Sequence, residues 1–173
     1  PAGVPGDPEY PTMRPSFAVE RTLGKLAKWL RILGFDTLYE GDLTADETAS
    51  YHDPQRISLT RTEKVRRRPT PRRRIFIEPD DPDRQLRQVI RAVGIRREDL
   101  QPFSRCILCN TPLAEVEKSD VKNRVPDYVW ETRTSFRRCP SCRRIYWAGS
   151  HIDRGLKRIQ ALFSNAESQR DDS

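Results

Sequence analysis

Four cysteines constrain this chain more than any other feature, and they form two C-x-x-C pairs, Cys106 with Cys109 and Cys139 with Cys142. Two residues between cysteines allow a tight turn to aim both sulfurs at one point. Two such turns build the tetrahedral thiolate cage that suits structural zinc. Four thiolates fill the coordination shell of zinc, so we expect Zn²⁺ to stabilise the fold and to take no part in a reaction.

Two alternatives compete with the zinc interpretation: a pair of disulfides in a secreted protein, and a redox dithiol. The N-terminus has no signal-peptide pattern, and a reducing cytoplasm keeps thiols free, so zinc is favoured over disulfides. A redox dithiol needs only one C-x-x-C and usually occurs in a βαβ context. We therefore expect a zinc ribbon over residues 101–152 and a cytoplasmic location.

The positive charge of the chain is concentrated in one segment. The formal net charge is +7, and residues 61–74 hold eight Lys or Arg residues and one acid, so this segment alone accounts for it. A concentrated basic patch indicates a polyanionic partner such as RNA or DNA, although a solvated loop is the simpler alternative. The candidate RNA-binding side chains are Arg61, Lys64, Arg66, Arg67, Arg68, Arg72, Arg73 and Arg74.

Strands and helices are expected to alternate over residues 17–100. Apolar residues at helical spacing predict helices over residues 21–33 and 83–93, with Arg31 on the exposed side of the first. Thr44 and Glu47 form a capping-box pattern that predicts the start of a further helix. Alternation of this kind implies a parallel sheet covered on both faces by helices. The expected strands are residues 16–20, 36–40, 56–60 and 74–78.

The remaining segments are smaller. Residues 1–16 are rich in proline and predict an extended tail, and residues before Met13, the single methionine, could be additional to the native chain. Within the ribbon, residues 125–130 and 145–147 are expected as strands. Residues 153–173 are expected as a short helix over residues 153–163 followed by a tail. No apolar run approaches the length of a membrane span, so we expect no membrane partner.

Acidic side chains fall near the carboxyl ends of the expected strands, where functional groups of parallel sheets collect. Such carboxylates could hold Mg²⁺ or Mn²⁺, which lowers the pKa of a bound water and neutralises charge on a phosphate. Each acid also has an ordinary structural interpretation, as a strand-end, turn or helix-start residue. The candidate catalytic acids are Glu20, Asp42, Asp46 and Glu63.

Several stretches resemble the RNase domain found at the C-terminus of the Mut-seven exonuclease and as free-standing bacterial and archaeal proteins. In chain order from Phe17 to His151, they are FAVERTLGKLAKWLRILGFDTLYEGD, RISLTRT, DDPDRQLRQVI, SRCILCNTPL, VPDYVWE and FRRCPSCRRIYWAGSH. The resemblance implies a PIN-like α/β domain followed by a zinc ribbon, and Mg²⁺- or Mn²⁺-dependent ribonuclease activity.

The acids that the resemblance implies are altered in this chain. Glu20 stands where the family usually has Asp, which lengthens the side chain by one methylene. Ala45 takes the usual place of the second acid, and Asp46 lies one step along, a rotation of about 100° on a helix. Thr62 takes the place of the third acid, beside Glu63. We therefore expect reduced or absent nuclease activity, with activity retained through the four candidate acids as the alternative.

The loop after the third strand also departs from the family. The resemblance implies a helix there, but Pro69 and Pro71 favour an exposed loop, and arginine binds phosphate through paired hydrogen bonds. The preferred interpretation is a protein that holds RNA, ribosomal or otherwise structured, on a PIN-like fold with weak or lost cleavage. An active ribonuclease and a zinc-ribbon adaptor for a protein partner are the alternatives.

Overall fold

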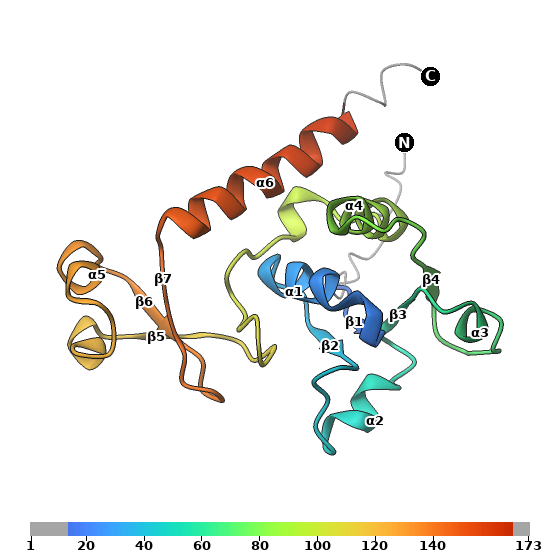
Figure 1. Ribbon diagram of the computed structural model, residues 1–173, viewed down its shortest axis with the longest axis horizontal. Coiled ribbons are helices and arrows are strands. Elements are labelled where there is room, and N and C mark those ends of the chain that lie inside the picture. Colours follow the sequence, from blue (N-terminus) through green and yellow to red (C-terminus); the bar gives the residue numbers. More distant parts are fainter. Residues whose placement is uncertain (1–13, 168–173) are drawn as a thin grey trace, which may run out of the picture.

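The computed structural model describes residues 14–167, which form an α/β domain and a small antiparallel ribbon (Figure 1). Most of the expected N-terminal tail, including Met13, lies outside the described residues, as do residues 168–173 of the expected C-terminal tail. No helix in the described part of the chain is both long and apolar enough to cross a membrane.

The first sheet has four parallel strands in the order β2-β1-β3-β4. This confirms the predicted α/β class with a parallel sheet. Each strand is one or two residues shorter than expected, because its first or last residues turn into the adjoining loops. The strands are β1 (Phe17–Val19), β2 (Thr37–Tyr39), β3 (Ile57–Thr60) and β4 (Arg74–Phe76).

Helices cover the two faces of this sheet unequally. A 3₁₀ turn, η1 (Arg21–Leu23), leads into α1 (Gly24–Ile32), which packs with α4 (Pro82–Val93) on one face and forms the main core. The short α2 (Glu47–Tyr51) contributes Tyr51 to a small cluster with Ala18 and Leu38 on the other face. The still shorter α3 (Glu63–Arg66) opens the arginine-rich loop. The second face is therefore thinly covered.

The ribbon follows a linker that contains η2 (Arg97–Asp99). Its strands β5 (Ala114–Val116), β6 (Phe136–Arg138) and β7 (Ile145–Trp147) pair antiparallel in that order, and η3 (Lys118–Val121) lies between β5 and β6. The predicted strand over residues 125–130 is wrong, because α5 (Asp127–Thr132) occupies this segment. Pro126 has a φ of −57°, and Asp127 lies in the first turn; both favour the start of a helix.

The last helix, α6 (Ser150–Glu167), returns from the ribbon to the α/β domain (Figure 1). It is longer than the predicted helix over residues 153–163. Ile159, Leu162 and Phe163 are buried in the main core beside α1 and α4. Arg158 forms an ion pair with Asp83 at the start of α4. The helix therefore ties the end of the ribbon to the α/β domain.

A buried arginine joins the two parts of the molecule. The guanidinium of Arg31 donates to the carbonyls of Ile107 (3.0 Å) and Leu108 (2.9 Å), which lie between the first two cysteines, and to the carbonyl of Thr37 (3.0 Å). It also pairs with Asp42 at 3.2 Å. The prediction that Arg31 is exposed is therefore wrong, because its five donor groups find enough acceptors to compensate for burial.

Asn110, the residue after the first cysteine pair, makes the second connection. Its side-chain oxygen accepts the backbone N–H of Thr37 at 2.9 Å, and its nitrogen donates to the carboxylate of Asp36 at 2.7 Å. Asn110 is itself buried. The first cysteine turn is thus attached to the beginning of β2 through hydrogen bonds rather than apolar packing.

Candidate functional site

The four cysteines come together at one point, as their spacing predicts. Their sulfur atoms all lie within 4.8 Å of one another, and the Sγ atoms of Cys106 and Cys142 are 3.7 Å apart. A tetrahedral ion with Zn–S bonds of about 2.3 Å places its ligands about 3.8 Å apart. The donor set and its spacing therefore suit zinc, held by Cys106, Cys109, Cys139 and Cys142.

The two cysteine turns have the same backbone geometry. In each, the residue after the second cysteine donates its N–H to the carbonyl of the first at 2.9 Å, and this residue has a positive φ (63° at Asn110 and 64° at Arg143). The N–H of the second cysteine points at the sulfur of the first at 3.4 Å in both turns. Backbone donors aimed at sulfur favour the thiolate form that a metal ion requires.

Glu20 lies at the switch point of the parallel sheet. Glu20 directly follows β1, whose neighbours in the sheet are β2 on one side and β3 on the other. Because the connections from β1 and β2 run in opposite directions across the sheet, a crevice opens there at the carboxyl ends of the strands. Its carboxylate accepts hydrogen bonds from the hydroxyls of Thr22 (2.6 Å), Thr60 and Thr62 (2.9 Å) and from the backbone N–H of Arg61 (3.4 Å).

These hydrogen bonds set the charge state of Glu20. Burial of the carboxyl opposes its ionisation, but the donors from the three threonines and Arg61 outweigh it, so the pKa of Glu20 lies below its ordinary value. Glu20 is therefore a carboxylate at neutral pH, and its oxygens are already engaged by protein donors.

The other candidate acids lie apart from Glu20. Asp42 faces Arg31 at the junction with the ribbon. Asp46 is exposed just before α2. Glu63 pairs with Arg66 (3.4 Å) and Arg67 (3.2 Å) along its own short helix. Within residues 14–167, only the cysteine cluster brings three or more His, Cys, Asp or Glu ligand atoms close enough to share a metal ion. The catalytic role of the four acids stays a prediction.

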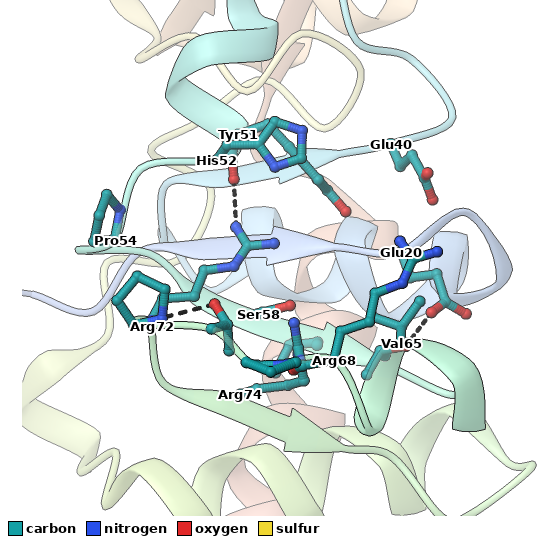
Figure 2. Close-up of a pocket in the computed structure, with 15 residues that line it drawn as sticks. Glu20, Glu40, Tyr51, His52, Pro54, Ser58, Val65, Arg68, Arg72 and Arg74 are labelled. Atoms are coloured by element: carbon teal, nitrogen blue, oxygen red, sulfur yellow. Dashed lines mark hydrogen bonds between the residues drawn. The ribbon is translucent and has the colours of Figure 1, made fainter.

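A cavity of about 330 Å³ opens beside Glu20 on the thinly covered face of the sheet (Figure 2). Glu40 and Tyr51 also line it, and sequence reasoning missed both. A signal for Glu40 was present, because it directly follows the second strand just as Glu20 follows the first. Burial raises the pKa of Tyr51 to about 12, helped by the negative charge of Glu40, so its hydroxyl stays protonated.

Three arginines of the basic segment line the same cavity: Arg68, Arg72 and Arg74. Arg72 donates to the carbonyl of Tyr51 at 2.6 Å and lies 5.6 Å from the centre of its ring. Arg74 donates to the carbonyl of Arg68 at 2.6 Å. The loop is thus held against α2 and against itself.

The other candidate RNA-binding residues lie outside the cavity. Arg61 pairs with Asp80, Arg73 donates to the carbonyl of Ala92, and Arg66 lies 4.6 Å from the centre of the Phe76 ring. Lys64 is exposed and has no side-chain partner among the described residues, and the same holds for Arg68 at the cavity. Their predicted contact with RNA stays a prediction.

The chain is thus an α/β protein with a parallel sheet, a polar crevice at the switch point of this sheet, and a four-cysteine ribbon that suits zinc. Residues 15–159 match the Mut7-C RNAse domain, and the chain belongs to this family. Searches among curated proteins and among solved structures find no significant match.

Proposed function

We propose that this chain is an RNA-binding domain built on an RNase fold whose capacity to cleave is weak or lost. Thr62 carries the proposal. It stands where the family resemblance implies an acid, and its hydroxyl donates to Glu20 at 2.9 Å. A metal-dependent nuclease needs two or three carboxylates around its ion. Here the switch-point carboxylate is surrounded by hydroxyl donors, which compete with a cation for the same oxygen lone pairs.

The basic segment supports the RNA-binding half of the proposal. Lys64 and Arg68 have no protein partner among the described residues, so they are available to phosphates. We propose that the remaining arginines of residues 61–74 add to the positive field, that zinc in the cysteine cluster holds the ribbon, and that the protein acts in the cytoplasm. Neutralising several phosphates releases counterions, so binding should weaken steeply with salt.

Cleavage of a labelled mixed-sequence RNA in Mn²⁺ tests the proposal with three proteins: the wild type, Glu20→Ala and Thr62→Asp. We expect no cleavage by the wild type, with the RNA retained in a gel shift. Thr62→Asp replaces a donor by a carboxylate, so we expect it to gain Mn²⁺ binding in calorimetry relative to the wild type.

Two results would contradict this proposal in different ways. Cleavage by the wild type that Glu20→Ala abolishes would establish an active metal-dependent ribonuclease. Absence of any RNA retention, at low as well as at physiological salt, would remove RNA as the ligand and leave the protein adaptor.

A further inference from the structure

The charged groups that line the cavity beside Glu20 are separated by sign. Figure 2 shows the carboxylates of Glu20 and Glu40 toward one end and the guanidinium of Arg72 toward the other. Arg68 reaches from the loop toward the acidic end, without an ion pair to either carboxylate. A ligand that fits this cavity carries negative charge at one end and hydrogen-bond donors at the other.

Several polar atoms around the cavity lack a partner among the described residues. The Nε of Arg74 is buried and has no acceptor, and the guanidinium of Arg68 has none either. A buried donor without an acceptor is unfavourable, so the Nε of Arg74 favours an external acceptor, whereas the exposed guanidinium of Arg68 is free to bind one. On the acidic side, Glu40 uses Oε2 to accept the N–H of Arg21 at 2.8 Å, which leaves Oε1 open.

The size of the cavity limits what can enter. A volume of about 330 Å³ lies at the lower end of the range for small-ligand pockets and has room for one nucleotide rather than a run of them. Pro54, Pro69 and Pro71 stand in its wall, so the wall has little freedom to widen. The end of an RNA strand therefore fits this volume more easily than an internal segment, which would have to pass through the cavity.

We propose that this cavity binds a single phosphate-bearing ribonucleotide at the end of an RNA strand. Arg72 and Arg74 hold the phosphate, and the exposed side chain of Arg68 turns from the acidic end of the cavity to add a third guanidinium. The ribose hydroxyls donate to Glu40 and meet the hydroxyl of Tyr51. A terminal phosphate carries a charge of about −1.5 to −2 at neutral pH, more than an internal phosphodiester, and suits a site with three arginines. The proposal deepens the RNA-binding function and rests on it.

The test compares three versions of one short single-stranded RNA: one with a 5′-phosphate, one with a 3′-phosphate and one with hydroxyls at both ends. Fluorescence anisotropy at physiological salt gives the affinities. We expect one phosphorylated form to bind about tenfold tighter than the hydroxyl form, the difference that charge-assisted hydrogen bonds supply. The same strand with a 2′-deoxy terminal nucleotide should lose part of this gain, because it lacks a donor for Glu40.

A matched pair of variants locates the effect. Arg68→Ala and Arg67→Ala remove the same charge from neighbouring exposed positions, but only Arg68 lines the cavity. We expect Arg68→Ala to abolish the preference for phosphorylated ends. We expect Arg67→Ala to lower the affinity for all of the RNA strands by a similar factor. Tyr51→Phe removes only the hydroxyl and should reduce discrimination against the 2′-deoxy end while phosphate preference persists.

The outcomes separate this inference from the general proposal. Equal affinity of the wild type for all three ends, with steep salt dependence, overturns the terminal-nucleotide site and leaves RNA binding intact. Binding of free ribonucleoside 5′-monophosphate that Arg68→Ala weakens, without binding of any strand, supports the cavity as a nucleotide site and overturns the RNA-binding function. Equal effects of the two arginine variants on end preference also overturn the inference.

Discussion

The carboxylate of Glu20 is held by hydroxyl and N–H donors, and this makes it a stabilising charge of the folded state. Its pKa is lowered in the fold because the hydrogen bonds from Thr22, Thr60, Thr62 and Arg61 outweigh the cost of burial. A group with a lowered folded pKa contributes stability above its unfolded pKa and loses it as the pH falls through the folded value. Glu20 therefore belongs among the groups that drive acid unfolding.

Glu20→Gln should destabilise the protein more at pH 7 than at pH 3. At pH 7 the variant loses the charge-assisted acceptor, and this difference shrinks at low pH, because the unfolded and then the folded wild type takes up a proton at Glu20. Urea unfolding followed by circular dichroism gives the difference in unfolding free energy at each pH. Glu115→Gln, at an exposed position of β5, is the control and should show no such dependence. A Glu20→Gln deficit that does not shrink on acidification would contradict the assigned role.

Residue by residue, the sequence predicted the cysteine cluster well and the buried polar residues poorly. Two short turns with two cysteines each leave few alternatives to a shared metal-type site. Helical spacing, in contrast, places Arg31 on one side of α1 but does not indicate which other segment of the chain contacts that side. The carbonyls of Ile107 and Leu108, which satisfy this arginine, belong to a segment far along the chain. The same reason concealed the part played by Asp42.

Two helices of the α/β domain end at glycines with a positive φ, and their surroundings differ. Gly34 follows α1 with a φ of 91°, and Gly94 follows α4 with a φ of 78°. A Cβ on Gly34 would lie 2.3 Å from the carbonyl oxygen of Gln101, whereas one on Gly94 would meet nothing within 4 Å. The linker passes over Gly34 because its amides, at Gln101 and Phe103, bind the last carbonyls of α1.

Gly94→Ala and Gly34→Ala should therefore have unequal effects. Gly94→Ala introduces backbone strain alone, and we expect a loss of about 1 kcal/mol in unfolding free energy. Gly34→Ala adds a steric clash with the linker and should cost about 1–3 kcal/mol more. Chemical denaturation of both variants gives the comparison. Equal losses would show that the linker moves aside freely, against the close approach described above.

At the level of elements, length decided what the sequence could predict. The helices α1 and α4 are long enough to show a helical period, and the strands of the parallel sheet lie between them in regular alternation. The ribbon strands β5 and β6 have three residues each, too few for any period, and neither was predicted, whereas the equally short β7 was. In the segment of α5, the aromatic and β-branched residues indicated a strand, but Pro126 and Asp127 start a helix there.

At the level of the whole molecule, the cysteine cluster and the α/β sheet share hydrogen bonds. The first cysteine turn binds Arg31 through two carbonyls and holds the amide of Thr37 through Asn110. Zinc binding in small domains is worth on the order of 10 kcal/mol, so loss of the ion should unfold the turn. The beginning of β2 would then lose partners although it contributes no ligand to the metal.

Chelation of zinc should therefore speed hydrogen exchange inside the α/β domain, and at one edge only. We expect the amide of Thr37 to lose protection in the presence of a strong chelator. The amide of Ile77, which donates to Thr60 at 2.8 Å on the opposite side of the sheet, should keep its protection. Hydrogen exchange of the two amides is measured by NMR with and without the chelator, and again after zinc is added back. Equal exposure of the two amides would indicate global unfolding instead.

The path of α6 has a consequence for how the protein is made. The ribbon lies between the α/β domain and a helix that supplies Ile159, Leu162 and Phe163 to the core of that domain. On the ribosome, the parallel sheet and its first helices emerge well before these three side chains exist. Until α6 has left the exit tunnel, the nascent chain exposes an apolar face of α1 and α4. We expect molecular chaperones to bind this exposed apolar face of the nascent chain during that interval.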